Sequence, residues 1–206
     1  MKKKIPNPTL KRLPVYYNIF CSADDEGRKT ISSAEIADFI GVDHTQVRKD
    51  MAAIEFAGKP KVGFDVASFI SYFNKIMKLR RKKKAVIVGA GNLGIAIARY
   101  DGFKKYGLEV CGVFDSDPYK IGLKVKTKEI SSISALPEFI KTAGVQVAIL
   151  TVPAPFAQEV VDTLIESGIK SIWNFAPVSL KVSDDVILWN QDLAASFLTL
   201  SIMMAK

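Results

Sequence analysis

The most constraining feature of this chain is a short apolar run that ends in a glycine-rich turn. Residues 85–88 are apolar, the next residues read Gly89-Ala90-Gly91-Asn92-Leu93-Gly94, and residues 93–100 have the character of a helix. In a dinucleotide-binding unit the first glycine permits a tight turn, the second lets the backbone approach a pyrophosphate, and the third lets helix and strand pack closely. The amides at the helix N-terminus would hold the phosphates.

An acidic residue at the right distance strengthens this interpretation. A second apolar run, residues 110–114, ends at Asp115, which lies 21 positions after Gly94. At this spacing a dinucleotide-binding unit places a carboxylate on the adenosine ribose. A glycine triple alone also occurs in ordinary turns between strand and helix. Strand, helix and acid together favour a cofactor site.

Strands and helices continue to alternate after Asp115, which predicts an α/β fold with a parallel sheet. We expect helices over residues 135–143 and 156–167 and strands over 145–152, 169–175 and 186–189, the last at an edge. Two strand ends, at Thr151 and Asn174, should reach the same crevice as the glycines and suit a nicotinamide ring. The predicted cofactor contacts are Gly89, Ala90, Gly91, Asn92, Leu93, Gly94, Asp115, Lys120, Thr151, Val152, Pro153, Asn174, Phe175, Ala176 and Pro177.

The distribution of charge divides the chain. The 206 residues carry a formal net charge of +8, but residues 1–84 hold 18 Lys+Arg against 9 Asp+Glu, and residues 85–206 hold 11 against 12. A basic module joined to a near-neutral one indicates that the first part binds a polyanion. The alternative is a basic solvated surface that only aids solubility.

Composition also indicates the cellular compartment of the protein. The two cysteines, Cys21 and Cys111, show no metal-type spacing, which argues for a reducing compartment without disulfides. The basic start is followed by Ile5-Pro6-Asn7-Pro8 rather than an apolar signal region. No apolar run approaches the roughly 18 residues of a membrane span. We therefore expect a soluble, cytoplasmic protein without a metal.

The basic part begins with an expected flexible arm over residues 1–8, a helix over 10–21 and a loop over 22–29. Ser32 and Glu35 are then placed as a capping box. In the short helix that follows, Ile36, Phe39 and Ile40 form one apolar face, and Gly41 should end the helix.

The next helix has the composition of a DNA-reading helix. Asp43 and Gln46 are placed as a second cap, and Val47, Met51 and Ile54 recur at the spacing of a buried face. The opposite face carries Thr45, Arg48, Lys49 and Ala52. Two short helices joined at a glycine turn suit a helix-turn-helix whose second helix enters the major groove. The alternative is a surface helix with an ordinary charged face.

The following segment predicts a wing. Residues 57–64 read as a tight β-turn element with Lys59 and Lys61 at its tip, which would touch the DNA backbone or minor groove. Asp65 should cap a helix over residues 66–79. The basic run 80–84 then forms the domain boundary, either as a solvated linker or in contact with phosphates.

The last segment, residues 192–204, is a helix that is apolar on almost every side. Such a helix must be buried. Because it follows the sheet at the end of the chain, we expect it to be buried by another subunit. The alternative is packing on its own domain.

These features together resemble the Rex family of bacterial redox-sensing transcriptional repressors over nearly the whole chain. The residues that carry the resemblance are Arg12-Leu13-Pro14-Val15-Tyr16-Tyr17, Gln46-Val47-Arg48-Lys49-Asp50, Gly89-Ala90-Gly91-Asn92-Leu93-Gly94, Val113-Phe114-Asp115-Ser116-Asp117-Pro118, Ile149-Leu150-Thr151-Val152-Pro153-Ala154 and Asn174-Phe175-Ala176-Pro177-Val178. The resemblance implies a winged-helix DNA-binding domain (1–79), a linker (80–84), a Rossmann NAD(H)-binding domain (85–190) and a dimerisation helix (191–206) exchanged between the subunits of a homodimer. It also implies repression that is relieved when NADH replaces NAD⁺.

The resemblance assigns roles to individual residues. Thr45, Gln46, Arg48 and Lys49 would contact operator DNA, with Lys59 and Lys61 in the wing. Asp115 would favour the free ribose hydroxyls of NAD(H) and repel a 2′-phosphate. Tyr100 and Asp192 resemble positions that couple the nicotinamide site to the arrangement of the domains.

Three departures from the family pattern concern the switch and the DNA contacts. Asn18 stands where the family often has an arginine that pairs with the acid at Asp192. This predicts that the response to NADH is weaker or depends on other contacts. The recognition helix continues with Met51-Ala52-Ala53-Ile54-Glu55 in place of Leu-Ser-Tyr-Phe-Gly, and the wing reads Lys59-Pro60-Lys61 in place of Lys-Arg-Gly. Operator sequence, affinity and NADH responsiveness are therefore left open.

Two other functions compete with this one. An NAD-dependent oxidoreductase is suggested by the Tyr-x-x-x-Lys spacing of Tyr100 and Lys104, but the intervening Asp101-Gly102 should break the helix. The single histidine, His44, belongs to the basic module, and residues 85–206 leave no room for a substrate domain. We therefore predict no catalytic residue. A DNA-binding protein that ignores NADH is the other alternative.

Overall fold

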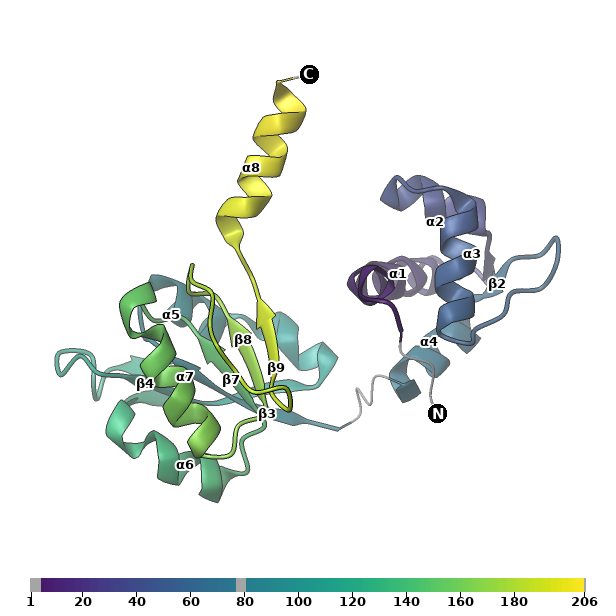
Figure 1. The fold of residues 1–206 in the computed structure, drawn as a ribbon. Helices are drawn as coiled ribbons and strands as arrows, with labels where there is room; N and C mark the ends of the chain where they lie inside the picture. The colour runs from purple at the N-terminus through teal and green to yellow at the C-terminus, as the bar shows by residue number, and fades with distance from the viewer. Residues whose placement is uncertain (1–4, 77–80, 206) are drawn as a thin grey trace. The chain divides into compact units, whose positions relative to one another are not determined.

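The computed structural model describes residues 5–76 and 81–205 and divides the chain into two compact units between Arg80 and Arg81 (Figure 1). The first unit contains helices and one small two-stranded sheet, and the second is built on a seven-stranded sheet. In the described ranges no helix has both the length and the apolar character that crossing a membrane requires. Those ranges also contain no group of three or more side chains suited to a metal ion.

The first helix is longer than predicted at both ends. Helix α1 spans Asn7–Asp25, so residues 7 and 8 are helical instead of part of the arm, whose first four residues lie outside the described ranges. Pro8 sits in the first helical turn, where a missing N–H leaves no hydrogen bond unmade. The loop predicted from Ser22 begins only after Asp25, because Ala23 is buried and prolongs the apolar face by a turn.

The second helix, α2 (Ser33–Ile40), confirms the predicted capping box. The Ser32 hydroxyl accepts a hydrogen bond from the Glu35 amide at 3.1 Å, and the Glu35 carboxylate accepts from the Ser32 amide at 2.8 Å. Gly41 ends the helix in the left-handed conformation, with φ 67°. Of the predicted apolar face, Ile36 is buried but Phe39 is 70% exposed, because the buried stripe runs through Ser33, Ile36 and Ala37 instead.

Helix α3 (His44–Ala53) has the predicted buried face but only half of the predicted cap. Val47, Met51 and Ile54 are all at most 3% exposed. Asp43 caps the helix by accepting a hydrogen bond from the Thr45 amide at 2.7 Å. Gln46 does not complete a second capping box, because its side-chain amide donates forward along the helix.

The segment after α3 forms a projecting turn, as predicted. Lys59 and Gly63 pair in an antiparallel bridge, and Lys61 between them adopts φ 60°. The chain then enters strand β2 (Phe64–Asp65), which pairs antiparallel with β1 (Thr30–Ile31).

Helix α4 (Val66–Ile76) closes the first unit. Its cap is the predicted Asp65, which accepts a hydrogen bond from the Ser68 amide at 2.8 Å. Its predicted end, residues 77–79, lies outside the described ranges. Phe69 and Phe73 of this helix are buried against α1, and the Phe69 ring stacks on Phe20 with centroids 3.8 Å apart.

A buried carboxylate joins α1 to α3. Asp50, 1% exposed, accepts hydrogen bonds from Arg12 (2.6 and 2.8 Å), Tyr16 (2.6 Å), Thr9 (2.9 Å) and Gln46 (3.0 Å). Burial would raise the pKa of Asp50, but these hydrogen bonds outweigh it and hold the pKa at about 2. Asp50 is therefore ionised and fixes the position of α3 on α1. We call this set the Asp50 cluster.

The second unit is the predicted open, mostly parallel sheet, in the strand order β5-β6-β4-β3-β7-β8-β9. Only the β5–β6 pair is antiparallel. The strands are β3 (Lys83–Val88), β4 (Leu108–Asp115), β5 (Lys124–Val125), β6 (Lys128–Ser132), β7 (Val147–Leu150), β8 (Ser171–Asn174) and β9 (Ile187–Asn190). The helices that connect them are α5 (Asn92–Arg99), α6 (Leu136–Ala143) and α7 (Ala157–Glu166), with 3₁₀ turns η1 (Asp101–Tyr106), η2 (Ile133–Ala135) and η3 (Ala154–Phe156).

The apolar run 85–88 is buried because β3 lies in the middle of the sheet. Val86 and Val88 face one core, which α6 and α7 complete, and Ala85 and Ile87 face the other, to which α5 contributes Ile97. Side chains alternate between the faces of a strand, so a central strand with both faces covered must be apolar throughout.

Two features of the sheet differ from the prediction. Strand β3 begins at Lys83, so the last two residues of the predicted linker belong to the sheet. The Lys83 amide donates to the Gly107 carbonyl at 2.7 Å, and the Lys84 carbonyl accepts from Gln146 at 2.9 Å. Strands β5 and β6 were not predicted, because their short sequences are largely polar and only Val125 and Ile130 are buried.

Helix α8 (Leu193–Met204) is not covered by the unit to which it belongs. No residue of the helix is buried, and its large apolar side chains are 53–76% exposed. Figure 1 shows it extending past the end of β9. The alternative that α8 packs on its own domain is therefore wrong for this chain.

The Asp50 cluster should make the stability of the first unit sensitive to acid. Replacing Asp50 with Asn leaves Arg12 without its ionised partner and should reduce the free energy of unfolding by about 3–5 kcal/mol, measured by urea titration with circular dichroism at neutral pH. Because folding lowers the pKa of Asp50, its contribution is complete above about pH 4 and is lost as pH falls toward the folded-state pKa of about 2.

The difference in unfolding free energy between wild type and Asp50→Asn should therefore shrink on acidification. Asp38→Asn, at an exposed position of α2, is the control and should change stability little. Equal stability of Asp50→Asn and wild type at neutral pH would contradict the role given to the cluster.

Candidate functional site

The glycine-rich turn has the backbone geometry that its sequence predicts. Gly89 has φ 104°, and a side chain there would lie 2.8 Å from the Thr151 carbonyl. At Gly94 a Cβ atom would lie 2.0 Å from the Gly89 carbonyl oxygen. The first glycine is therefore required by the turn and the third by close packing of α5 on it.

Gly91 differs from the other two glycines. A Cβ atom built on it would meet no atom within 4 Å, so it faces open space. Gly91 is also the N-cap of α5 and offers no side chain to the first amides of that helix. These amides carry the positive end of the helix dipole and suit an anionic group.

Asp115 holds the turn from the end of β4. Its carboxylate accepts hydrogen bonds from the amide of Ala90 at 2.6 Å and from that of Asp117 at 2.9 Å, and Lys120 Nζ lies 3.2 Å away. Burial would raise the pKa of Asp115, but the two amides and Lys120 outweigh it and lower the pKa. The side chain is thus ionised and fixed, and can accept a further hydrogen bond.

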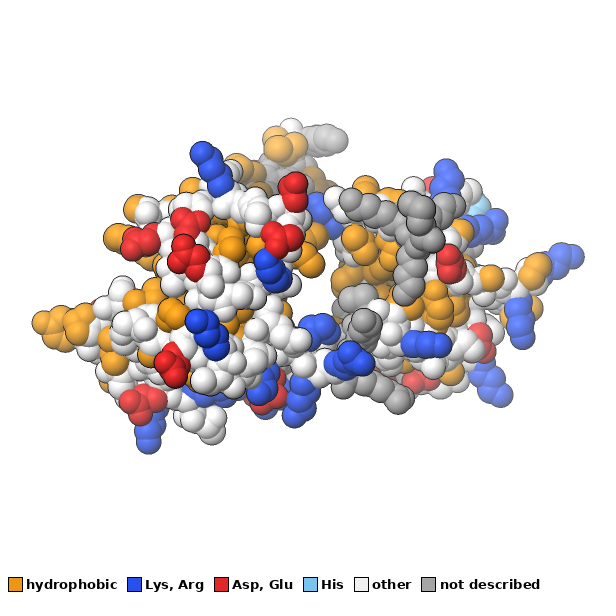
Figure 2. Space-filling view, turned by 60° about the horizontal axis from the view of Figure 1, so that its bottom comes forward, with side chains coloured by type: hydrophobic (Ala, Val, Ile, Leu, Met, Phe, Trp, Pro, Cys, Tyr) orange, Lys and Arg blue, Asp and Glu red, His pale blue; other side chains and the backbone are white. Residues whose placement is uncertain are grey.

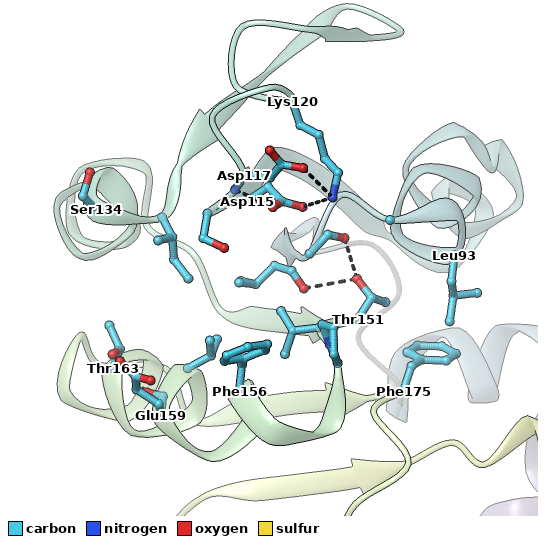
Figure 3. A pocket seen from close by; sticks show the side chains of 18 of the residues that line it. Leu93, Asp115, Asp117, Lys120, Ser134, Thr151, Phe156, Glu159, Thr163 and Phe175 are labelled. Atoms are coloured by element: carbon cyan, nitrogen blue, oxygen red, sulfur yellow. Dashed lines mark hydrogen bonds and ion pairs between the residues drawn. The ribbon is translucent and has the colours of Figure 1, made fainter.

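A cavity of about 790 Å³ opens where β3, β4 and β7 end (Figure 3), and we call it the nucleotide cavity after the cofactor contacts that the sequence predicts. The structure brings most of the predicted cofactor contacts together around it. They are Gly89, Gly91, Leu93, Asp115, Lys120, Thr151, Val152, Pro153, Phe175 and Pro177. In Figure 3, Asp115 and Lys120 lie on one side of the cavity and Phe156 and Phe175 on the other.

Five predicted contacts do not line this cavity: Ala90, Asn92, Gly94, Asn174 and Ala176. Ala90 and Gly94 are buried in the turn, whereas Asn92 is exposed. Asn174 is 1% exposed, and its side chain bonds to the backbone of Ala176 and to the Asn190 side chain. The amide expected in the crevice is therefore used inside the loop that follows β8.

The Thr151 hydroxyl was also expected to face a ligand, but it stabilises the glycine-rich turn. Its hydroxyl donates to the carbonyl oxygens of Val88 at 3.1 Å and Gly89 at 2.8 Å (Figure 3). The β7 strand end is thereby fixed against the glycine-rich turn.

Several lining residues were missed by the sequence analysis. Ile133, Ser134 and Pro137 follow β6, the strand that was not predicted. Their sequence offered no signal, because β6 is short and largely polar. Phe156, Glu159, Val160 and Thr163 line the opposite side from η3 and α7, and their helical spacing marks one face of that segment.

The predicted DNA contacts lie on the surface of the first unit. Thr45, Arg48 and Lys49 are exposed on α3, and Gln46 is half-buried. Arg48 Nε donates to the Ser33 hydroxyl at 3.2 Å, which ties its side chain to α2.

The projecting turn completes this basic surface. Lys59 and Lys61 are exposed, and together with Arg48 and Ala52 they line a hollow of about 800 Å³ between α3 and the turn. Figure 2 shows Lys and Arg side chains at the projecting end of this unit.

The Tyr-x-x-x-Lys pair does not form an enzyme site at the nucleotide cavity. Helix α5 ends at Arg99, and Lys104 lies in η1, where its ammonium pairs with Asp101 at 2.9 Å. Tyr100 is 60% exposed and packs edge-on against Phe103. Neither Tyr100 nor Lys104 lines the nucleotide cavity, and both border a separate hollow.

The remaining predicted positions have structural contacts of their own. Asp192 caps α8 by accepting hydrogen bonds from the amides of Ala194 and Ala195 at 2.8 and 3.0 Å. Neither Cys21 nor Cys111 forms a disulfide with a described residue, and Cys111 is half-buried and donates to the Ala85 carbonyl at 3.2 Å. Burial raises the pKa of the Cys111 thiol, which keeps it protonated.

Comparison with known proteins gives consistent matches over the whole length. Family models described as "Putative DNA-binding protein N-terminus" and "CoA binding domain" match residues 4–52 and 80–178. Proteins named redox-sensing transcriptional repressor Rex are 37% identical in Treponema denticola and 40% identical in Clostridioides difficile. The alignments cover 98% and 99% of this chain and 97% of each relative.

Solved structures match equally well. RSP, described as a Rex-family repressor, has been solved in complex with β-NAD⁺ and operator DNA. That structure has a TM-score of 0.91 and 36% identity over 98% of this chain and 94% of its own. RSP in complex with β-NADH has a TM-score of 0.89 and 36% identity over 97% and 94%.

The second and third glycines of the turn should respond differently to the same substitution. Gly94→Ala forces a Cβ atom against the Gly89 backbone and should destabilise the second unit by roughly 1–3 kcal/mol. Gly91→Ala places its Cβ in open space and should change stability by less than about 0.5 kcal/mol. Thermal unfolding of the two variants measures the contrast, and equal losses would contradict the geometry.

Proposed function

This chain belongs to the Rex family of redox-sensing transcriptional repressors, and on that premise we propose that it binds operator DNA and releases it when NADH replaces NAD⁺. The observation that carries the proposal is the match over 98% of the chain to a repressor solved with both β-NAD⁺ and operator DNA. The same repressor has been solved with β-NADH. The cytoplasm, where operator DNA and the NAD(H) pool meet, is the proposed location.

The nucleotide cavity supports the cofactor half of this proposal. Gly91 and the open amides of α5 would receive the pyrophosphate. Asp115, ionised and fixed, would accept a hydrogen bond from a ribose hydroxyl and repel a 2′-phosphate, which favours NAD(H) over NADP(H). Thr151 to Pro153, with Phe175 and Pro177, would surround the nicotinamide end.

The first unit supports the DNA half. Helix α3 presents Thr45, Gln46, Arg48 and Lys49 at and near its N-terminal end, where a recognition helix contacts bases and phosphates. Lys59 and Lys61 on the projecting turn would neutralise flanking phosphates, since their ammonium groups are exposed. The excess positive charge of residues 1–84 favours the same partner.

The exposed α8 supports a homodimer. Its apolar side chains, such as Phe197 and Leu198, find no cover in their own unit and would be buried by exchange with a second copy. A dimer places two recognition helices on two half-sites, so a change in subunit arrangement can release DNA. Tyr100 and Asp192 are the proposed coupling positions, and Asn18 excludes an arginine–Asp192 ion pair at that point.

The matched relatives are named as repressors, and this agrees with the absence of catalytic residues from the predicted site. The Tyr100–Lys104 pair of the oxidoreductase alternative lies away from the nucleotide cavity. The bound dinucleotide is therefore proposed as a signal that sets DNA affinity.

A titration of DNA binding with nucleotides tests the function. The full-length protein is first used to enrich operator sequences from fragmented genomic DNA, and fluorescence anisotropy then follows its binding to them. NADH should lower the affinity for DNA, whereas NAD⁺ should not and NADPH should act only at much higher concentration. DNA binding that is unchanged by millimolar NADH would overturn the sensor, and substrate-dependent oxidation of NADH would support an enzyme.

Two variants of cavity residues test whether NADH acts through the nucleotide cavity, and a third variant, in α3, provides the contrast. Asp115→Ala should bind DNA as wild type does but require much more NADH for release. Gly91→Ala should do the same, because its Cβ would occupy space assigned to the pyrophosphate. Lys49→Ala should instead weaken DNA binding and leave the NADH response of the remaining complex unchanged.

Removal of α8 tests the dimer. Deletion of the residues after Asn190 should give monomers by light scattering, because the apolar surface that a second copy would cover is gone. Leu198→Asp, a single charge on the same helix, should also weaken dimerisation, whereas Thr199→Ala should not. A truncated protein that remains dimeric would count against exchange of this helix.

A further inference from the structure

The side-chain amide of Gln46 has a fixed orientation in this structure. Its nitrogen Nε2 donates to Asp50 Oδ1 at 3.0 Å, one turn further along α3. An ionised carboxylate accepts hydrogen bonds and cannot donate them. Rotation of the amide by half a turn would set the Gln46 oxygen against the Asp50 oxygen, so the nitrogen must face Asp50.

The other members of the Asp50 cluster prevent Asp50 from turning away. Arg12 donates to both carboxylate oxygens, Tyr16 donates to Oδ2 and Thr9 donates to Oδ1. Thr9, Tyr16 and Asp50 are each at most 4% exposed, so solvent does not compete for these bonds. The orientation of the Gln46 amide is therefore set by α1, a helix outside the recognition element.

The consequence concerns the atom that Gln46 leaves for a partner. One of its two amide hydrogens is committed to Asp50, while the oxygen Oε1 accepts no hydrogen bond from any described residue. Oε1 is also not among the buried atoms without partners in those residues, so it is not fully buried. A glutamine without this constraint could exchange the positions of its oxygen and nitrogen by rotation of the amide, and Gln46 cannot.

We propose that Gln46 is a specificity-determining residue that reads an exocyclic amino group in the major groove, N6 of adenine or N4 of cytosine, with its oxygen as the acceptor. This inference rests on the proposed DNA-binding function. Guanine O6 and thymine O4 are acceptors. Either of them opposite Oε1 would place acceptor against acceptor, whereas adenine and cytosine donate there.

The inference is tested with base analogues on an operator enriched by the full-length protein without NADH. Each adenine is replaced in turn by purine and each cytosine by 2-pyrimidinone, which lack the amino group. Each guanine is replaced by 2-aminopurine, which lacks O6, and each thymine by 5-methyl-2-pyrimidinone, which lacks O4. Dissociation constants are measured for wild type, Gln46→Ala and Gln46→Met, with circular dichroism to verify that the variants fold.

The expected result is coupling between Gln46 and one amino group, which means that removal of that amino group weakens binding only when Gln46 is present. Both variants should bind the unmodified operator roughly tenfold more weakly than wild type. Loss of the amino group at one adenine or cytosine should weaken wild type by a similar factor and leave the Gln46 variants unaffected. Lys61→Ala, the control at a proposed phosphate contact of the projecting turn, should bind every analogue more weakly by the same factor, since a phosphate contact does not sense base identity.

Coupling at a guanine O6 or a thymine O4, or coupling at no base, would overturn this inference while leaving the repressor function intact. If the wild-type protein enriches no DNA sequence at all, the proposed function fails and the inference fails with it.

Discussion

A buried ionised carboxylate accepts hydrogen bonds in several directions and donates none, and one such group fixes the functional element of each unit. Asp50 holds α3 on α1 through four hydrogen bonds from three α1 side chains, and it accepts a fifth from Gln46 of α3 itself. Asp115 holds the glycine-rich turn at the end of β4 through the amides of Ala90 and Asp117. Both carboxylates have lowered pKa values despite burial, because their partners are fixed donors.

These two groups act on different kinds of site, but the physical consequence is the same. A surface that reads another molecule must be held in one geometry before that molecule arrives, otherwise binding has to supply the ordering free energy. Around Asp115 the result is a nucleotide cavity whose turn is already formed. Around Asp50 it is helix α3, the proposed recognition helix, on which the orientation of the Gln46 amide is also set. Helix α8 has no such support, and its apolar side chains are exposed in its own unit.

Much of the second unit could be predicted because its constraints are local. Gly89 is required by the turn and Gly94 by close packing against it, and the buried run 85–88 follows from a strand covered on both faces. The same local reasoning failed for β5 and β6, whose residues are mostly polar and are held as strands by pairing with β4. It also failed for Phe39, since the few apolar positions of α2 do not specify which of them faces the core.

The sequence by itself determined the two-part organisation, the order of strands and helices, the glycine-rich turn and the excess of positive charge in the first part. These properties follow from spacing and composition along the chain. Only the tertiary structure decided that the side chains of Thr151 and Asn174, which were expected to face the crevice, form hydrogen bonds to neighbouring backbone groups instead. It alone also showed that the Gln46 amide is oriented by Asp50. The physical reason is that a hydrogen-bonding side chain has several partners within reach, and which of them it takes depends on residues brought near it from distant parts of the chain.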